Sequence, residues 1–244
     1  MPAARESLLD AAYTALANRA WAAVRMVDVA AAAGVSRQTL YNEFGSKEGL
    51  ARALVRRETD NYLAGVARAL ARGGAPAAGT RGDAAARVVA AAAWTLRTAR
   101  ANPLVRAALT GCWGDRLPTP SGASADRAPL RAARSGVPAQ RAASSGEGPL
   151  PGPAELVGRF CDQAVAALEP GWPKEELPAL GSVCETAARL TLSCVVAPVA
   201  TAAPEPGRVP AQRTRPEAET EAVSRLVRGA FAQLPGGTEP GDGG

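Results

Sequence analysis

The chain has 244 residues, of which 47% are hydrophobic, 21% are charged and only 4% are aromatic. This composition is typical of a globular protein, and its abundant alanine favours closely packed helices. The absence of histidine excludes Ser-His-Asp and Cys-His catalysis, so no enzyme activity is expected. The opening residues do not resemble a signal peptide, and the longest uncharged apolar run covers only residues 88–96. The sequence therefore predicts a cytoplasmic protein with no membrane partner.

The formal net charge of +5 is not concentrated near the N-terminus. Residues 1–62 carry eight Lys or Arg and seven Asp or Glu, so this segment is nearly neutral. DNA binding by this segment would therefore depend on local geometry rather than on bulk charge. The cysteines are scattered without a CxxC pair, which predicts reduced thiols, no metal site and no cofactor. They are Cys112, Cys161, Cys184 and Cys194.

Apolar residues recur at helical spacing from the start of the chain. The spacing predicts four helices in the first third, namely residues 5–18, the segment MVDVAAAAG that ends at Gly34, residues 37–44, and residues 47–72. Serine and glycine mark the turns between them. Ser36 and Ser46 have the chemistry of helix N-caps, and Gly45 suits the end of the third helix.

Five further helical patterns follow, at residues 82–101, 103–112, 153–169, 174–197 and 216–234. No stretch alternates with period two, so the predicted fold class is all-α. Stretches rich in Pro, Gly and Ser at 115–152 and 198–215 predict flexible loops, and residues 235–244 predict a disordered tail. We expect an N-terminal three-helix domain, residues 1–46, and a helical domain, residues 47–234.

The third predicted helix has two different faces. Leu40 and Phe44 fall together on a helical wheel, where they would pack inward. The opposite arc includes Gln38, Thr39 and Asn42, whose side chains can hydrogen-bond to base edges. This pattern is also typical of an ordinary amphipathic helix whose polar side meets water. The layout of short helix, glycine turn and short helix is that of a helix-turn-helix motif and favours DNA binding.

The segment VDVAAAAGVSRQTLYNEFGSKEGL resembles the DNA-binding segment of the TetR family of bacterial one-component regulators. The resemblance rests on the run from Ala30 to Ser36, on TLY with Phe44, and on SKEGL, and it covers about residues 5–55. It implies an N-terminal helix-turn-helix domain followed by a helical ligand-binding and dimerisation domain. The implied partners are a pseudo-palindromic DNA operator, a small-molecule effector and a second copy of the chain.

By position, the resemblance implies that residues 36–44 form a recognition helix. The implied base contacts are Arg37, Gln38, Thr39 and Asn42, and the implied phosphate contacts are Ser36, Tyr41 and Lys47. The family usually has a small polar residue just before the second helix, where this chain has Val24 and Arg25. Arg25 can reach a phosphate, but its side chain cannot cap the helix because it has no oxygen.

The large apolar side chains of the middle helices are candidates for a ligand pocket or for plain core. They are Trp94, Leu104, Leu109, Trp113 and Phe160. Because few charges interrupt these helices, an apolar effector is expected. Stripes on the last two long helices fit either a dimer interface, as the resemblance implies, or burial in their own chain. They comprise Val183, Ala187, Leu190, Val223, Leu226, Val227 and Ala230.

The expected function is that of a homodimeric transcriptional repressor that leaves DNA when it binds a small apolar molecule. The alternative is a helical carrier or interaction protein whose helix-turn-helix does not bind DNA. The near-neutral charge of residues 1–62 favours this alternative.

Overall fold

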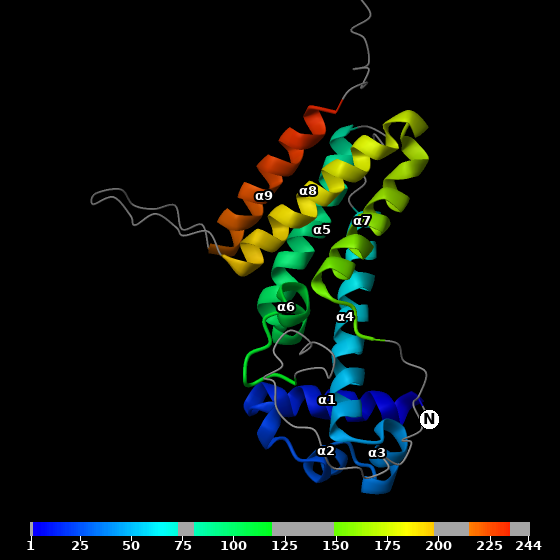
Figure 1. Ribbon diagram of the computed structural model, residues 1–244, viewed down its shortest axis with the longest axis vertical. Coiled ribbons are helices and arrows are strands. Elements are labelled where there is room, and N and C mark those ends of the chain that lie inside the picture. Colours follow the sequence, from blue (N-terminus) through cyan, green and yellow to red (C-terminus); the bar gives the residue numbers. More distant parts are fainter. Residues whose placement is uncertain (1, 73–80, 119–148, 198–214, 235–244) are drawn as a thin grey trace, which may run out of the picture. The chain divides into compact units, whose positions relative to one another are not determined.

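A computed structural model describes residues 2–72, 81–118, 149–197 and 215–234, and all regular structure in these ranges is helical (Figure 1). The all-α prediction is therefore confirmed for the described residues. The tail and most of the two expected loops lie outside the described residues. The described chain forms two compact units.

The first unit includes the described residues 2–59, 111–118 and 149–151. Its elements are α1 (Pro2–Asn18), the short 3₁₀ helix η1 (Trp21–Ala23), α2 (Met26–Ala32), α3 (Arg37–Phe44) and the first half of α4 (Lys47–Arg72). Helices α1, α2 and α3 pack against one another (Figure 1). Their contact surface is aliphatic, because each helix places apolar residues at i, i+3 and i+4 on its inner side. The largest fully buried side chains of this unit are Leu8, Leu9 and Leu40, together with Leu50 and Leu54 of α4.

The predicted turn residues are confirmed. Gly34 and Gly45 adopt φ angles of 68° and 69°, a left-handed region that favours glycine. The Ser36 Oγ accepts a hydrogen bond of 3.0 Å from the Thr39 amide at the start of α3. The Ser46 Oγ accepts one of 3.1 Å from the Gly49 amide at the start of α4. These caps satisfy amides that have no partner within their own helix.

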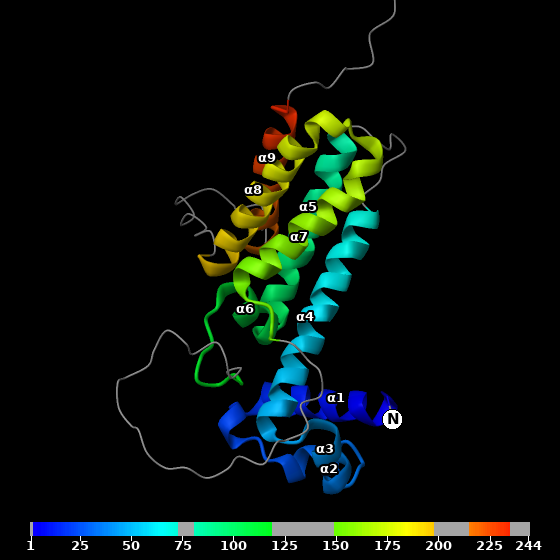
Figure 2. The same cartoon turned by 45° about the vertical axis from the view of Figure 1, so that its right-hand side comes forward.

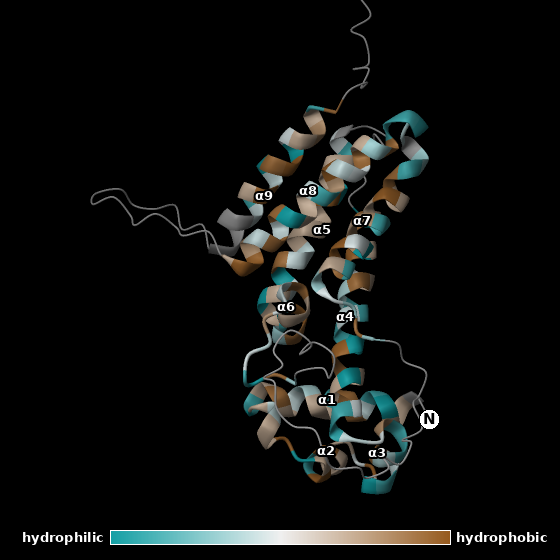
Figure 3. Cartoon of the chain, in the orientation of Figure 1, coloured by the Kyte–Doolittle hydropathy of each residue, from teal (hydrophilic) through white to brown (hydrophobic). Residues whose placement is uncertain are grey.

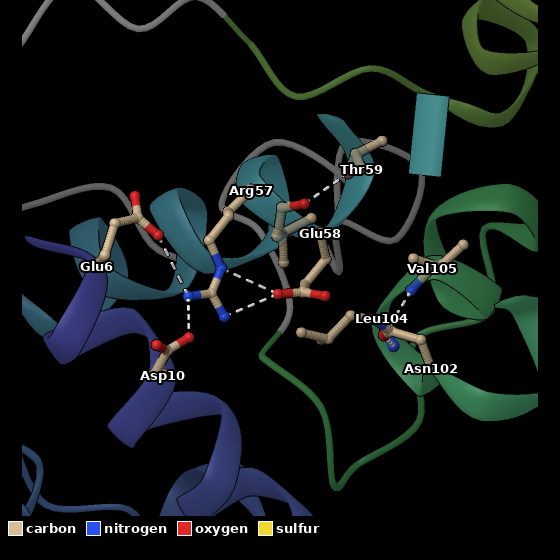
Figure 4. A network of polar contacts seen from close by, with 9 residues as sticks. Glu6, Asp10, Arg57, Glu58, Thr59, Asn102, Leu104 and Val105 are labelled. Carbon is tan, nitrogen blue, oxygen red and sulfur yellow. Dashed lines mark hydrogen bonds and ion pairs between the residues drawn. The ribbon is translucent and has the colours of Figure 1, made fainter. Parts of the chain in front are cut away.

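An ion-pair network joins α1 to the first half of α4 (Figure 4). The Arg57 guanidinium, whose side chain is only 14% exposed, lies 2.6 Å from Asp10, 2.9 Å from Glu58 and 3.6 Å from Glu6. Partial burial makes such charge-assisted bonds stronger than those of an open surface. The start of α4 is therefore held to the three-helix head.

The second unit includes residues 60–110 and the described part of 152–244. Its elements are the second half of α4, α5 (Arg81–Ala101), α6 (Pro103–Thr110), α7 (Pro153–Leu168), η2 (Glu169–Gly171), η3 (Lys174–Glu176), α8 (Leu177–Val196) and α9 (Arg215–Ala232). Helix α5 packs against α6, α8 and α9, and α7 packs against α8 (Figure 2).

Two of the differences between the predicted and observed helix boundaries have a clear cause in the backbone. The pattern at residues 174–197 splits into η3 and α8, and Pro178 lies in the first turn of α8. Proline has no amide hydrogen to donate, so it is best accommodated in the first turn of an α-helix. Helix α6 ends at Thr110 because Gly111 has a φ of 71° and breaks the helical path.

The segment Lys174–Val196 is long and apolar enough to cross a membrane by length and composition alone. In this chain its α-helical part packs against α5, α7 and α9. Side chains along its length, including Leu180, Cys184 and Val195, are buried there. Packing within the second unit buries 33% of this apolar window.

Candidate DNA-binding interface

Helix α3 separates its apolar and polar side chains cleanly. Leu40 is fully buried and Phe44 is nearly so. Arg37, Gln38 and Asn42 are exposed. Figure 3 shows hydrophilic residues gathered on this helix. The two apolar residues therefore fix the helix, and its free face consists of hydrogen-bonding groups.

The first turn of α3 uses its hydroxyl groups internally. Besides capping the Thr39 amide, the Ser36 Oγ lies 2.9 Å from the Thr39 Oγ1. Thr39 is half-buried, unlike the neighbouring Gln38. Thr39 is thus less available for a base contact than the sequence indicated, and its methyl group remains the part best suited to touch a base.

Gln38 and Asn42 form one hydrogen-bonded unit on the exposed face. The Gln38 Nε2 donates to the Asn42 Oδ1 at 2.8 Å, one helical turn away. This bond leaves one amide oxygen and one amide nitrogen free to face a ligand. The same donor and acceptor pair remains if both amide groups are turned over. The major-groove edge of adenine, with N7 and the N6 amino group, is complementary to such a pair.

Arg25 lies at the N-cap position of α2 and makes no cap bond with its side chain. Its guanidinium instead donates to both carboxylate oxygens of Asp28 at 3.0 Å, and Arg19 approaches the same carboxylate at 3.4 Å. The hydrogen bond from Arg25 holds the pKa of Asp28 below its usual value. Arg25 is highly exposed and could turn to a phosphate, but it would give up this pair to do so.

Lys47, at the start of α4, is tied to the chain before α2. Its Nζ donates to the Ala22 carbonyl at 3.0 Å and lies 5.5 Å from the centre of the Trp21 ring. Ammonium groups are attracted to the faces of aromatic rings. Lys47 thus holds η1 against α4 in addition to any contact it makes with phosphate. Sequence reasoning missed these contacts because Ala22 and Trp21 lie 25 and 26 residues before Lys47 in the chain.

Two further supports of α3 were not predicted. The Arg5 guanidinium covers the Phe44 ring at 4.9 Å and lies 3.9 Å from Glu43. At the next turn, a Cβ on Gly49 would overlap the Phe44 carbonyl. Only glycine therefore allows α4 to begin this close to the end of α3. The single glycine of SKEGL, Gly49, is the sequence signal for this approach.

The second unit encloses a small apolar cavity of about 10 Å³. It is lined by Tyr62, Thr95, Leu109, Leu156, Val157, Phe160, Ala188, Thr191 and Leu192. Of the five pocket candidates, Leu109 and Phe160 line this cavity, whereas Trp94, Leu104 and Trp113 do not. A cavity of this size holds about one water molecule, so a larger ligand would have to part the helices around it.

The three other candidates have different positions. The Trp94 indole lies against Gly65, where a Cβ would overlap the ring, and its Nε1 donates to the Tyr62 carbonyl at 3.1 Å. Leu104 is buried at the start of α6, where its amide donates to Asn102 Oδ1 (Figure 4). Trp113 belongs to the first unit. Their size suited a pocket, but helix packing assigns them to other surfaces.

The hydroxyl groups at the cavity are already paired. The Thr95 Oγ1 donates to the Ala91 carbonyl at 2.9 Å and lies 3.2 Å from the Tyr62 hydroxyl. The Thr191 Oγ1 donates to the Ala187 carbonyl at 2.7 Å. Burial raises the pKa of Tyr62 to about 12, so its phenol stays neutral. The cavity thus offers an apolar, uncharged interior.

The apolar stripes on α8 and α9 do not lie wholly on the surface. Ala187, Val223 and Val227 are buried within the second unit, which agrees with the alternative that they pack against their own chain. A helical stripe gives no indication of whether it meets its own chain or another. Four of the seven candidates keep exposed area: Leu226 at 55%, and the half-buried Val183, Leu190 and Ala230.

Among the described residues, no three His, Cys, Asp or Glu side chains are grouped in a way that could hold a metal ion. Burial raises the pKa of Cys161 to about 11 and that of Cys184 to about 12. These two thiols are therefore protonated at neutral pH and are poor nucleophiles.

Comparison with known proteins bears directly on the first unit. Residues 8–54 match the family described as "Bacterial regulatory proteins, tetR family". The HTH-type transcriptional regulator AlkX of Mycobacterium tuberculosis is 51% identical over 59 residues, which make up 24% of this chain and 28% of that protein.

The fold of the whole chain is similar to that of a solved structure. The TetR family repressor AlkX from Dietzia sp. strain DQ12-45-1b superposes with a TM-score of 0.50 at 20% identity. The superposition covers 94% of this chain and 97% of that one, and at this identity it establishes likeness of fold alone. The helix-turn-helix segment of this chain, across α3 and both adjoining turns, therefore matches that of the TetR family of bacterial regulatory proteins.

Proposed function

We propose that this protein is a sequence-specific DNA-binding transcriptional repressor that acts as a homodimer and is released from DNA by a small apolar molecule. The exposed polar face of α3, held by the buried Leu40 and Phe44, is the observation that carries the DNA-binding part. A helix of this kind fits the major groove, where hydrogen-bonding side chains distinguish base pairs.

The base-reading groups are Arg37 and the Gln38–Asn42 unit. Arg37 is suited to the two acceptors of guanine, and the amide unit is suited to adenine. Tyr41, 40% exposed, and the amides at the start of α3 near Ser36 would contact phosphates. Phosphate contacts by Lys47 and Arg25 would compete with the bonds these side chains already make.

A dimer is required because one recognition helix covers only a few base pairs. Two heads spaced by about 34–36 Å reach successive major grooves on one side of a pseudo-palindrome. Helices α8 and α9, which pack side by side, offer the outer surface for this contact. Leu226 at 55% and Val196 at 60% are the large apolar side chains of the second unit that stand most exposed.

Effector release would act through α4, which runs without a break from Lys47 to Arg72. Its start is held to the head by Arg57, and its later residue Tyr62 lines the apolar cavity. A ligand that opens the cavity would therefore press on a helix that also carries the head. It must bind the DNA-incompetent state more tightly by a few kcal/mol, since equal affinity for both states shifts nothing.

A binding-site selection from random DNA with the full-length protein tests the DNA-binding proposal. We expect a pseudo-palindromic site bound in a salt-sensitive, sequence-specific complex. The competing carrier function is favoured by the near balance of eight basic and seven acidic residues in positions 1–62. Recovery of no enriched sequence, together with tight binding of an apolar ligand, would support the carrier instead.

A further inference from the structure

The carboxylate of Asp28 on α2 binds two arginines at once. The Arg25 guanidinium donates from Nε to one carboxylate oxygen and from Nη2 to the other, both at 3.0 Å. Arg19, which follows α1, donates from Nη1 at 3.4 Å. The Asp28 side chain is 31% exposed, against 48% for Arg19 and 73% for Arg25. Asp28 is thus the inner member of a group that we call the Arg–Asp–Arg cluster.

The carboxylates of the helices packed against α2 bind other arginines. Helix α2 packs against α1 and α3. The three carboxylates of α1 and α3 pair outside the cluster: Glu6 and Asp10 with Arg57, and Glu43 with Arg5. Among the described carboxylates of α1, α2 and α3, Asp28 is therefore the one that binds Arg19 and Arg25.

The cluster lies where a helix-turn-helix motif approaches the DNA backbone. The first helix of such a motif crosses the phosphates, while the second enters the major groove. Arg25 is the residue directly before α2, the first of these helices. A guanidinium binds phosphate through two parallel hydrogen bonds, which is the arrangement that Asp28 already makes with Arg25. Asp28 thus occupies donors that a DNA phosphate would use.

The exposure of the cluster decides whether this exchange can take place. Ion pairs between exposed side chains contribute little to stability, because water screens them and long side chains lose freedom in them. Phosphate contacts on DNA are favoured in addition by the release of counterions from the duplex. The arginines can therefore leave Asp28 for phosphate, and the breaking of the cluster opposes DNA binding by only a small amount.

We propose that Asp28 is an internal competitor of DNA phosphate that sets the affinity of the head for its operator. In the free protein its carboxylate holds Arg25 and Arg19, and in the DNA complex both arginines transfer to phosphate. This inference rests on the proposed DNA-binding function and adds a control of affinity to the same surface. Operator binding is weaker than the arginines alone would make it, so an effector releases the DNA more easily.

Fluorescence anisotropy of the full-length protein on the selected operator, over a range of salt concentrations, tests this competition. Asp28→Asn removes the negative charge and keeps the size of the side chain. We expect it to bind the operator about two- to fivefold more tightly. The dependence on salt should be unchanged, because the same phosphates are contacted. Asp60→Asn is the matched control, since it removes one charge from an exposed residue of the second unit, and its affinity should equal that of the wild type.

A double-variant cycle shows whether Asp28 acts through Arg25. Arg25→Gln should weaken operator binding about three- to tenfold and reduce the salt slope by about 1. In Asp28→Asn/Arg25→Gln most of the gain from Asp28→Asn should be lost, because Arg25 makes the two shorter bonds of the cluster. An effect of Asp28 on the folding of α2 alone would not depend on Arg25. Urea unfolding curves confirm that each variant is folded.

Three results would overturn this inference. Unchanged operator affinity in Asp28→Asn would show that the carboxylate does not compete. Weaker binding would show that Asp28 steadies Arg25 against phosphate instead of withholding it. Tighter binding with a salt slope steeper by about 1 or more would show that the arginines stay on Asp28 in the wild-type complex.

Random-sequence duplex DNA separates these results from failure of the proposed function. If no operator is selected but Asp28→Asn binds random duplex more tightly than the wild type, the competition stands and sequence-specific repression fails. If an operator is bound and Asp28→Asn changes nothing, sequence-specific binding stands and the competition fails. If neither protein binds any duplex, both are rejected.

Discussion

The two units place their functional groups in opposite environments. In the first unit the candidate groups stand on the outside of α3, and the buried Leu40 and Phe44 only hold them in place. In the second unit the candidate site is an apolar cavity inside the packing of α4, α5, α6, α7 and α8. An exposed polar face needs one helix to define it, whereas a cavity needs the correct packing of five.

This difference also explains why the two units compare so differently with known proteins. A DNA-reading helix keeps its chemistry only if particular side chains recur at particular positions, and the family match covers residues 8–54. A cavity of apolar side chains can be built from many combinations of Ala, Leu and Val. Likeness in the second unit is therefore found in the fold rather than in the sequence.

The largest expected effect separates the two faces of α3. Leu40→Ala should lower the free energy of unfolding by about 2–5 kcal/mol, because it leaves a cavity at a fully buried position. Gln38→Ala on the exposed face should change it by less than about 0.5 kcal/mol. Urea unfolding followed by circular dichroism measures both. Similar losses for the two variants would contradict the division of α3 into a packed face and a free face.

A second pair of variants tests packing in the second unit. Gly65→Ala should lower the free energy of unfolding by about 1–3 kcal/mol. The new Cβ displaces the Trp94 indole and weakens its hydrogen bond to the Tyr62 carbonyl. Gly158→Ala is the matched control in α7, where a Cβ meets nothing within 4 Å. Gly158→Ala should instead raise the free energy of unfolding by up to about 1 kcal/mol, since alanine is the better helix former. Two changes of the same sign would contradict the close contact at Gly65.

The units should also differ in their response to pH. Tyr62, Cys161 and Cys184 of the second unit have raised pKa values of about 12, 11 and 12. A raised pKa means that the folded state holds its proton more tightly than the unfolded state. The stability these groups contribute is therefore complete below their ordinary values, 9.0 for the thiols and 10.0 for the phenol, and is lost as the pH rises towards 12.

In the first unit the pKa of Asp28 is lowered by its hydrogen bond to Arg25, and that of Glu48 is lowered by a hydrogen bond at its own backbone amide. Their contribution is present above the ordinary carboxylate values and is lost as the pH falls. Single-tryptophan variants that retain Trp21 or Trp94 report on the two units by fluorescence. Alkali should affect the Trp94 signal more, and acid the Trp21 signal. If alkali mainly changed the Trp21 signal and acid mainly changed the Trp94 signal, the assignment of acid sensitivity to the first unit and alkali sensitivity to the second would be contradicted.

The smallest expected effect is a difference in reaction rate between thiols that differ in exposure. Cys112 is exposed, whereas Cys184 is buried and has a raised pKa. A thiol-specific colorimetric reagent at pH 8 should modify Cys112 rapidly and Cys184 only as slowly as the second unit opens. Cys112→Ser should remove the fast phase. A fast phase that survives this substitution would show that a second thiol is accessible.

Local chemistry made much of the first unit predictable from sequence. The turns at Ser36, Gly45 and Ser46 could be predicted because helix capping and a positive φ depend on only a few neighbouring residues. The contact of Lys47 with Ala22 and that of Arg5 with Phe44 could not be predicted, since each joins residues far apart in the chain. The only indication of these two contacts in the sequence is a long charged side chain on a helix that packs against other helices.

The second unit shows the limit of periodicity more clearly. The stripes on α8 and α9 were visible in the sequence, yet Ala187, Val223 and Val227 proved to be buried in their own unit. Likewise Trp94 packs on Gly65 rather than lining the cavity. Residue size and spacing indicate that a side chain is buried, but only the arrangement of the helices decides which surface it meets.

The most direct test of the central claim is a binding-site selection with the wild-type protein, Gln38→Ala, Asn42→Ala and Arg97→Gln. If α3 reads DNA and its two amides act together, both amide variants should lose the preference for adenine at the same operator position. Arg97→Gln should select the wild-type site. Unchanged selection by both amide variants would contradict the claim that the polar face of α3 reads the operator.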